Sequence, residues 1–101
     1  MKTKFLTGNQ FYNLPKNQRT GCVLSPNGDK HFYKEDLLHR EDGPAIEFAS
    51  GEKHWYYENR FHRLDGPAVE YANGKVEYYL EGKKYSYTEW YAILNNLEKF
   101  I

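Results

Sequence analysis

The stretch His62-Arg63-Leu64-Asp65-Gly66-Pro67-Ala68-Val69-Glu70-Tyr71 decides the fold, because it is a second copy of His39-Arg40-Glu41-Asp42-Gly43-Pro44-Ala45-Ile46-Glu47-Phe48. The two copies lie 23 residues apart. The same offset carries Asn27-Gly28 onto Ser50-Gly51 and then onto Asn73-Gly74. A repeat of fixed period therefore runs from about residue 20 to residue 85, and such periods are typical of proteins built from stacked supersecondary units.

Each repeat predicts one β-hairpin with a tight corner behind it. The Asn-Gly and Ser-Gly pairs are hairpin turn signals, because these residues take the positive φ angles of a two-residue turn. Further turns are expected around Glu35-Asp36, Glu58-Asn59 and Glu81-Gly82. The predicted strands of this antiparallel meander are residues 21–25, 30–34, 45–48, 53–57, 68–71 and 76–80.

Two segments outside the repeats are expected to cap the sheet. Residues 1–19 show no clear period, and we expect a short strand or a helical turn on the first sheet edge. After the repeats of residues 20–85, the pattern Ser86-Tyr87-Thr88-Glu89 is a capping box that opens a helix. Residues 86–101 then predict an amphipathic helix of about four turns. Its apolar side is Trp90, Ile93, Leu94, Leu97 and Ile101.

Size and charge exclude several classes of protein. At 101 residues the chain makes one small domain. Its 14 basic and 14 acidic residues cancel, which disfavours unspecific binding to nucleic acids or anionic membranes. The single cysteine, Cys22, has no internal disulfide partner. No apolar run is long enough for a signal peptide or a membrane span, so we expect a soluble cytoplasmic protein.

The repeat resembles a known family. The pattern is Gly51-x-x-x-Trp55-Tyr56-x-x-Asn59-x-x-His62-Arg63-Leu64-Asp65-Gly66-Pro67-Ala68. It is similar to membrane occupation and recognition nexus (MORN) repeats, and more closely to the MORN-like "HRxDGPA" repeats of small proteins in large tailed bacteriophages. The resemblance implies a β-hairpin repeat sheet used as a binding scaffold and no enzymatic activity. The fold expected is therefore mainly β, an antiparallel meander of MORN-like hairpins with a C-terminal amphipathic helix.

The His-Arg-x-Asp motifs favour a structural role over catalysis. Equivalent residues of two hairpins lie two strands apart, about 9.5 Å, so His39 and His62 cannot easily share one zinc ion, and no metal or cofactor is expected. Asp and Gly suit the turns, and each Pro starts the next strand. Arg40 and Arg63 are expected to pair with neighbouring carboxylates. The turn residues concerned are Asp42, Gly43, Pro44, Asp65, Gly66 and Pro67.

Aromatic residues at the repeat period give a candidate binding surface. Alternation in a strand places Trp55 and Tyr57 on one face of the sheet, and His54 and Tyr56 on the other. One helix cannot cover both faces, so some of these rings should stay exposed. The candidate binding residues are His39, Arg40, His62, Arg63, Tyr33, Trp55, Tyr56 and Tyr79.

Four functions remain open at this point. The first is a non-enzymatic phage protein that binds and inhibits a host protein, such as a defence component. The second is a sponge for a nucleotide second messenger, with an arginine on phosphate and a tyrosine stacked on the base. The third is a nucleic-acid-binding modulator, against which the zero net charge argues. The fourth is a structural module that forms a homo-oligomer, to which an open sheet edge could contribute.

Overall fold

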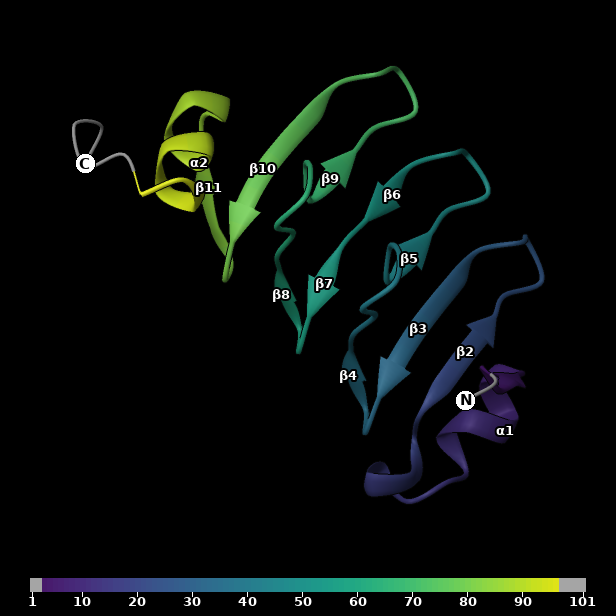
Figure 1. The fold of residues 1–101 in the computed structure, drawn as a ribbon. Coiled ribbons are helices and arrows are strands. Elements are labelled where there is room, and N and C mark those ends of the chain that lie inside the picture. Colours follow the sequence, from purple (N-terminus) through teal and green to yellow (C-terminus); the bar gives the residue numbers. More distant parts are fainter. Residues whose placement is uncertain (1–2, 97–101) are drawn as a thin grey trace.

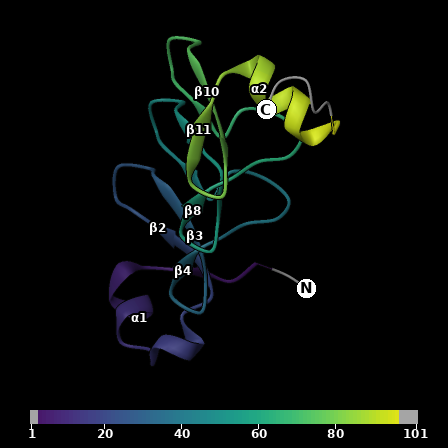
Figure 2. The same ribbon diagram turned by 90° about the vertical axis from the view of Figure 1, so that its left-hand side faces the viewer.

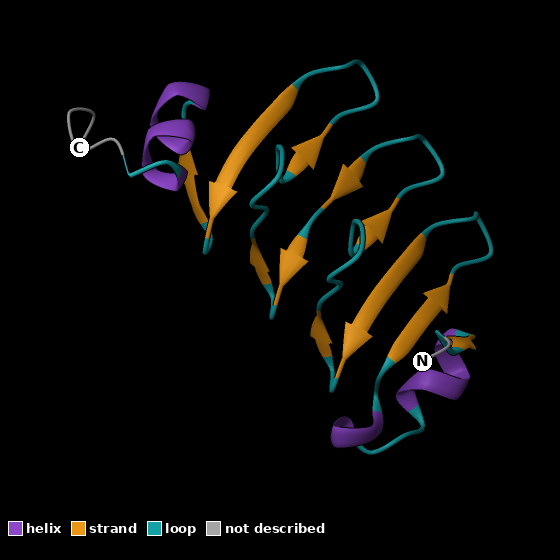
Figure 3. Ribbon diagram, viewed as in Figure 1, coloured by secondary structure: helices purple, strands orange, loops and turns teal. Residues whose placement is uncertain are grey.

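Short strands and tight turns follow one another along most of the chain. The structure is a computed structural model that describes residues 3–96, and the molecule is elongated, 50 × 30 × 21 Å. The hairpins succeed each other along the long axis (Figure 1). The expected fold class is confirmed, because strands and their turns dominate and a helix closes the chain (Figure 3).

The elements are short, as a repeat of 23 residues requires. The helices are α1 (Gly8–Tyr12), the 3₁₀ helix η1 (Lys16–Gln18) and α2 (Tyr87–Leu94). The strands are β1 (Phe5–Leu6), β2 (Gly21–Leu24), β3 (Lys30–Lys34), β4 (Leu37–Leu38), β5 (Ile46–Glu47), β6 (Lys53–His54), β7 (Tyr56–Tyr57), β8 (Arg60–Phe61), β9 (Val69–Glu70), β10 (Val76–Leu80) and β11 (Lys83–Tyr85).

One sheet runs through the molecule in the order β1-β2-β3-β5-β6-β9-β10-β11, with β4 paired to the lower half of β3. All pairs are antiparallel except β1 with β2. β7 and β8 form a separate hairpin ladder below β6 and β9. The predicted strand of residues 53–57 is thus divided at Trp55, and β4, β8 and β11 are strands beyond the six expected.

Two kinds of turn alternate along the sheet. In the Asn-Gly and Ser-Gly loops only the glycines have positive φ, 97° at Gly28, 99° at Gly51 and 92° at Gly74. The Gly28 loop is closed by a bond from the Ser25 N–H to the Asp29 carbonyl, 3.0 Å. These are three-residue loops with a left-handed glycine, so the expected two-residue turn is wrong there. Two-residue turns do occur at the opposite ends of the hairpins, where Glu58 and Asn59 have φ of 47° and 67°.

The two faces of the sheet carry different side chains. The arginine face, as we name it, carries Phe32, Trp55 and Tyr78 with Arg40 and Arg63 above them. Residues directly opposite in adjacent strands share a face. The register therefore gives the other face, the tyrosine face, the residues Val23, His31, Tyr33, Ile46, His54, Tyr56, Val69 and Tyr79. The side view shows α2 on one side of the strands and α1 on the other (Figure 2).

The N-terminal segment packs on the tyrosine face at the first edge. β1 pairs with β2, and a capping box of Thr7 and Gln10 opens α1. The buried ring of Phe11 stacks on Tyr33, with centroids 4.6 Å apart. The Thr20 hydroxyl accepts the Glu35 N–H at 2.9 Å and so fixes the first two-residue turn.

Helix α2 is shorter than expected and buries a different side. Its capping box is present as predicted, with the Ser86 Oγ accepting from the Glu89 N–H at 3.1 Å. The helix ends at Leu94, and Asn96 is left-handed with φ 58°. Trp90 and Ala92 are buried, whereas Ile93 and Leu94 are exposed, so the predicted apolar stripe is wrong for these two residues; Leu97 and Ile101 lie outside the described residues. No helix in residues 3–96 has the length and apolar character to cross a membrane.

Candidate functional site

Two arginines lie flat over aromatic rings on the arginine face. The Arg40 Cζ is 3.9 Å from the centre of the Phe32 ring, and the Arg63 Cζ is 3.8 Å from that of Trp55. The planar guanidinium group stacks on an aromatic face at this distance. Each repeat thus holds its own arginine on the ring of its central strand.

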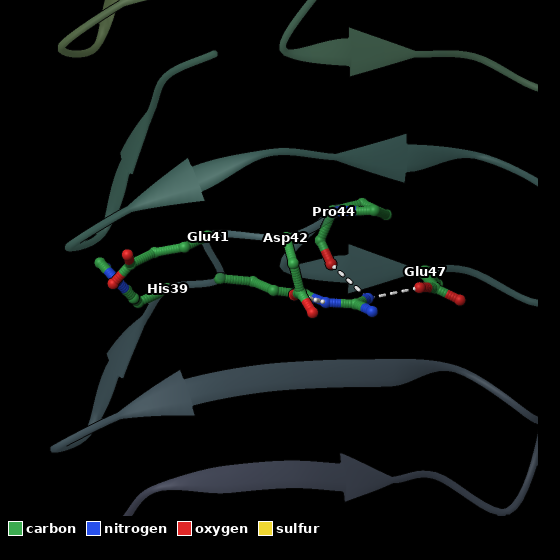
Figure 4. A network of polar contacts seen from close by, with 6 residues as sticks. His39, Glu41, Asp42, Pro44 and Glu47 are labelled. Atoms are coloured by element: carbon green, nitrogen blue, oxygen red, sulfur yellow. Dashed lines mark hydrogen bonds and ion pairs between the residues drawn. The ribbon is translucent and has the colours of Figure 1, made fainter. Parts of the chain in front are cut away.

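Both guanidinium groups also hold their corner loops together. The Arg40 Nε donates to the Asp42 carboxylate at 2.9 Å, and NH1 donates to the Pro44 carbonyl at 3.1 Å and to Glu47 at 2.6 Å (Figure 4). Arg63 repeats these bonds with Asp65, Pro67 and Glu70. The hydrogen bond and the charge of Arg40 lower the pKa of the exposed Asp42 carboxyl. The expected pairing of both arginines with neighbouring carboxylates is therefore present.

The glycines of the corners make room for these arginines. A Cβ atom on Gly43 would lie 3.0 Å from the Arg40 Cζ, and one on Gly66 would lie 2.8 Å from the Arg63 Cζ. Neither glycine is among the residues with positive φ, so the expectation of an unusual backbone angle is wrong. Each guanidinium is instead enclosed between a ring below and a glycine above.

The two histidines connect one repeat to the next. The His39 Nδ1 accepts the Glu58 N–H at 3.2 Å, and the His62 Nδ1 accepts the Glu81 N–H at 2.9 Å. In each case the donor opens the two-residue turn of the following unit. An imidazole that accepts at Nδ1 carries its hydrogen at Nε2, which in His39 lies 3.1 Å from the Glu41 carboxylate. No group of three or more potential metal ligands is assembled within residues 3–96.

Helix α2 supplies the third repeat with a substitute for the arginine. The Trp90 ring lies 4.9 Å from the Tyr78 ring, centre to centre, where Arg40 and Arg63 occupy the two earlier units. The Trp90 Nε1 donates to the Arg63 carbonyl at 3.1 Å. The helix therefore closes the row of stacked pairs.

The candidate tyrosines lie on the opposite face from the arginines. Tyr56 stacks on Phe61 with centroids 4.4 Å apart, and Phe61 lies 4.8 Å from Tyr79. Burial, and next the neighbouring Tyr79, raise the pKa of the Tyr56 phenol. These rings, with Tyr33, form a half-buried ladder along the tyrosine face. The candidate residues are thus divided between two surfaces and do not form one site.

An open groove of about 690 Å³ separates the two corners on the arginine face. Residues 40–43 line one side and residues 62–65 the other, with residues 55–57 between them. Leu64 is 60% exposed and Tyr57 is 48% exposed. The carboxylates of Glu41, Asp42 and Asp65 are also exposed. The groove thus combines apolar contact area with an acidic rim.

Several residues of this arrangement were not among the sequence candidates. They are Phe32, Glu47, Tyr57, Leu64, Glu70 and Tyr78. The period gave a usable signal for most of them, because Phe32, Trp55 and Tyr78 are spaced by 23 residues, as are Glu47 and Glu70. Leu64 had no such signal, since it occupies the position where the two motifs differ.

Fold and groove together define a β-hairpin repeat protein with one groove between two arginine-stapled corners. No protein-family model, curated protein or solved structure matches this chain.

Proposed function

We propose that this chain is a non-enzymatic binding protein whose partner docks in the groove between the two corners. The observation that carries the proposal is the division of labour within the HRxDGPA motif. The residues shared by both copies bind one another, whereas the variable third residue, Glu41 or Leu64, points its side chain to solvent beside the groove. Variable exposed positions on a fixed scaffold suit recognition.

The groove favours a protein segment over a nucleotide. In Arg40 and Arg63 the Nε and NH1 donors already bind residues of their own repeat. The exposed carboxylates of Asp42 and Asp65 would repel a phosphate. A partner segment with an apolar side chain against Leu64 and a basic one near the rim matches the exposed groups.

The resemblance to phage MORN-like repeats extends the proposal. A small viral protein with a rigid binding groove would act on a host protein, and we propose inhibition of a host defence factor as the outcome. A sponge for a second messenger is the alternative that the same experiment distinguishes.

The experiment is native mass spectrometry of the tagged chain recovered from bacterial lysate. Leu64→Arg places a bulky cation in the groove, and Leu24→Arg makes the same change at a position 41% exposed on β2. We expect a stoichiometric bacterial protein with the parent chain and with Leu24→Arg, and at least a tenfold loss with Leu64→Arg. A partner retained equally by both variants would contradict the groove. A bound mass of several hundred daltons would favour the nucleotide sponge.

A further inference from the structure

The sheet has an open edge at its C-terminal end. In the first unit the Phe32 N–H donates to the Ala45 carbonyl, and in the second the Trp55 N–H donates to the Ala68 carbonyl, both at 2.7 Å. The equivalent third residue is Tyr78. Within residues 3–96 no strand follows on that side of β10 above its ladder with β11. The upper half of β10 is therefore paired on one side alone.

Backbone groups of β10 point towards this edge. The carbonyls of Lys75 and Glu77 accept from the Tyr71 and Ala68 N–H groups, at 2.8 and 2.9 Å, on the β9 side. Successive residues of an antiparallel strand direct their N–H and C=O groups to opposite sides. The N–H and C=O of Val76 therefore face the open edge, and they are available to another strand.

A notch of about 310 Å³ lies at this edge, lined among others by Lys75, Val76, Tyr85 and Tyr87. The Val76 side chain is 44% exposed. Helix α2 packs against the arginine face through Trp90, which stacks on Tyr78, and lies to one side of the strands rather than in line with them (Figure 2). The helix thus does not replace the missing strand.

We propose that this edge pairs with the same edge of a second copy of the chain, antiparallel and about a two-fold axis. The edge sequence Lys75-Val76-Glu77 is self-complementary in this arrangement. Val76 lies opposite Val76 of the second copy and exchanges two backbone hydrogen bonds with it. Lys75 of each copy then lies directly opposite Glu77 of the other, and opposite charges in this position stabilise a sheet.

Exposed apolar side chains of α2 extend the surface beside the notch. Tyr87 is 55% exposed and Tyr91 is 48% exposed, and their rings lie 6.0 Å apart. Two-fold pairing of the strands brings the two α2 helices to the same side of the joined sheet, so these rings add apolar contact area. Because one edge is used twice, the assembly closes as a dimer and does not grow into a filament.

Sedimentation velocity of the full chain over a concentration series tests the dimer. Lys75→Glu sets two glutamates opposite each other twice in the dimer, and we expect its dissociation constant to rise at least tenfold. Lys16→Glu is the matched control, since it makes the same charge change on an exposed residue of η1 at the other end and should leave the constant unchanged.

Cysteine cross-linking tests the register independently. Hydrogen-bonded partners of an antiparallel pair have Cα atoms about 5.5 Å apart, which a disulfide can bridge. We therefore expect Val76→Cys to form covalent dimers under mild oxidation at least tenfold faster than Leu37→Cys, a control position 38% exposed on β4. A parent chain that is monomeric throughout overturns the proposal, as does a dimer that Lys75→Glu leaves intact or that Val76→Cys fails to trap. None of these variants touches the groove, so both proposals can fail separately.

Discussion

At the scale of single residues, the HRxDGPA motif is a device for holding one arginine. The ring below, the glycine above and the carboxylates at the sides leave the guanidinium about one-fifth exposed, 24% in Arg40 and 20% in Arg63. The pairing with carboxylates could be predicted from the sequence, because Asp and Glu are neighbours in both copies. The role of glycine could not, since it depends on where the arginine side chain lies after folding.

Gly66→Ala should be strongly destabilising for this reason. The added methyl group would meet the Arg63 Cζ at 2.8 Å and displace the guanidinium from Trp55 and its carboxylates. We expect the free energy of unfolding to fall by about 1 to 3 kcal/mol, measured by urea denaturation. In an Arg63→Ala background the same change should cost far less, since contacting residues are not additive. Gly8→Ala is the control, because a Cβ there meets nothing within 4 Å.

His31 should make stability depend on pH. Burial lowers its pKa, although the charge of Asp29 opposes this. The unfolded chain, with a histidine pKa of about 6.5, therefore binds a proton at a higher pH than the folded chain does. The free energy of unfolding should decrease as the pH falls below about 6.5, until the lower folded pKa is passed. In His31→Gln this part of the decrease between pH 6.5 and 5 should disappear; an unchanged slope would contradict the assignment.

At the scale of elements, local signals predicted where structure begins better than where it ends. The capping box of α2 could be found because it needs nothing beyond Ser86 and Glu89. The end of the helix at Leu94 could not, since the apolar period continues to Ile101 in the sequence. The buried side of α2 was also mispredicted, because it depends on how Trp90 enters the row of stacked rings.

Ser86→Ala tests how far α2 depends on its cap. The change removes the oxygen that accepts the Glu89 N–H, and loss of such a cap costs about 1 kcal/mol. Urea denaturation should show this loss with an unchanged slope. Ser86→Asp keeps an acceptor at the same position and should restore most of the stability. If Ser86→Ala is neutral, the packing of Trp90 alone holds the helix.

At the scale of the whole molecule, each repeat binds the next through the same contacts. His39 and His62 each accept the first N–H of the next turn, and each central strand donates to the alanine carbonyl that follows its corner. The period predicted the number and order of the hairpins. It could not predict which face the arginines and α2 would occupy, because a strand of period 2 offers two faces and the choice is made by packing.

Because the contacts repeat, the sheet should accept another unit. We expect a copy of residues 50–72 inserted after Ala72 to fold, with the first His62 bonded to the turn of the new unit and the second to Glu81. Stability of repeat proteins is approximately a sum over units and their interfaces. The denaturant slope should rise by about a fifth, in line with 23 residues added to 101. The long axis measured by X-ray scattering should grow by about 10 Å, two strand spacings.

An insertion without the copy of Ala72 is the matched control. It adds one residue fewer and shifts the following strands by one position, which turns every side chain of Val76–Leu80 to the wrong face. Tyr78 would then leave Trp90, and Glu77 would leave Lys84, its ion-pair partner at 3.2 Å. We therefore expect the shorter insertion to lower the unfolding midpoint below that of the parent chain, while the full insertion does not. Equal stability of the two insertions would mean that neighbouring units are joined by flexible connections, and that the contacts from each histidine to the next turn do not hold the sheet in register.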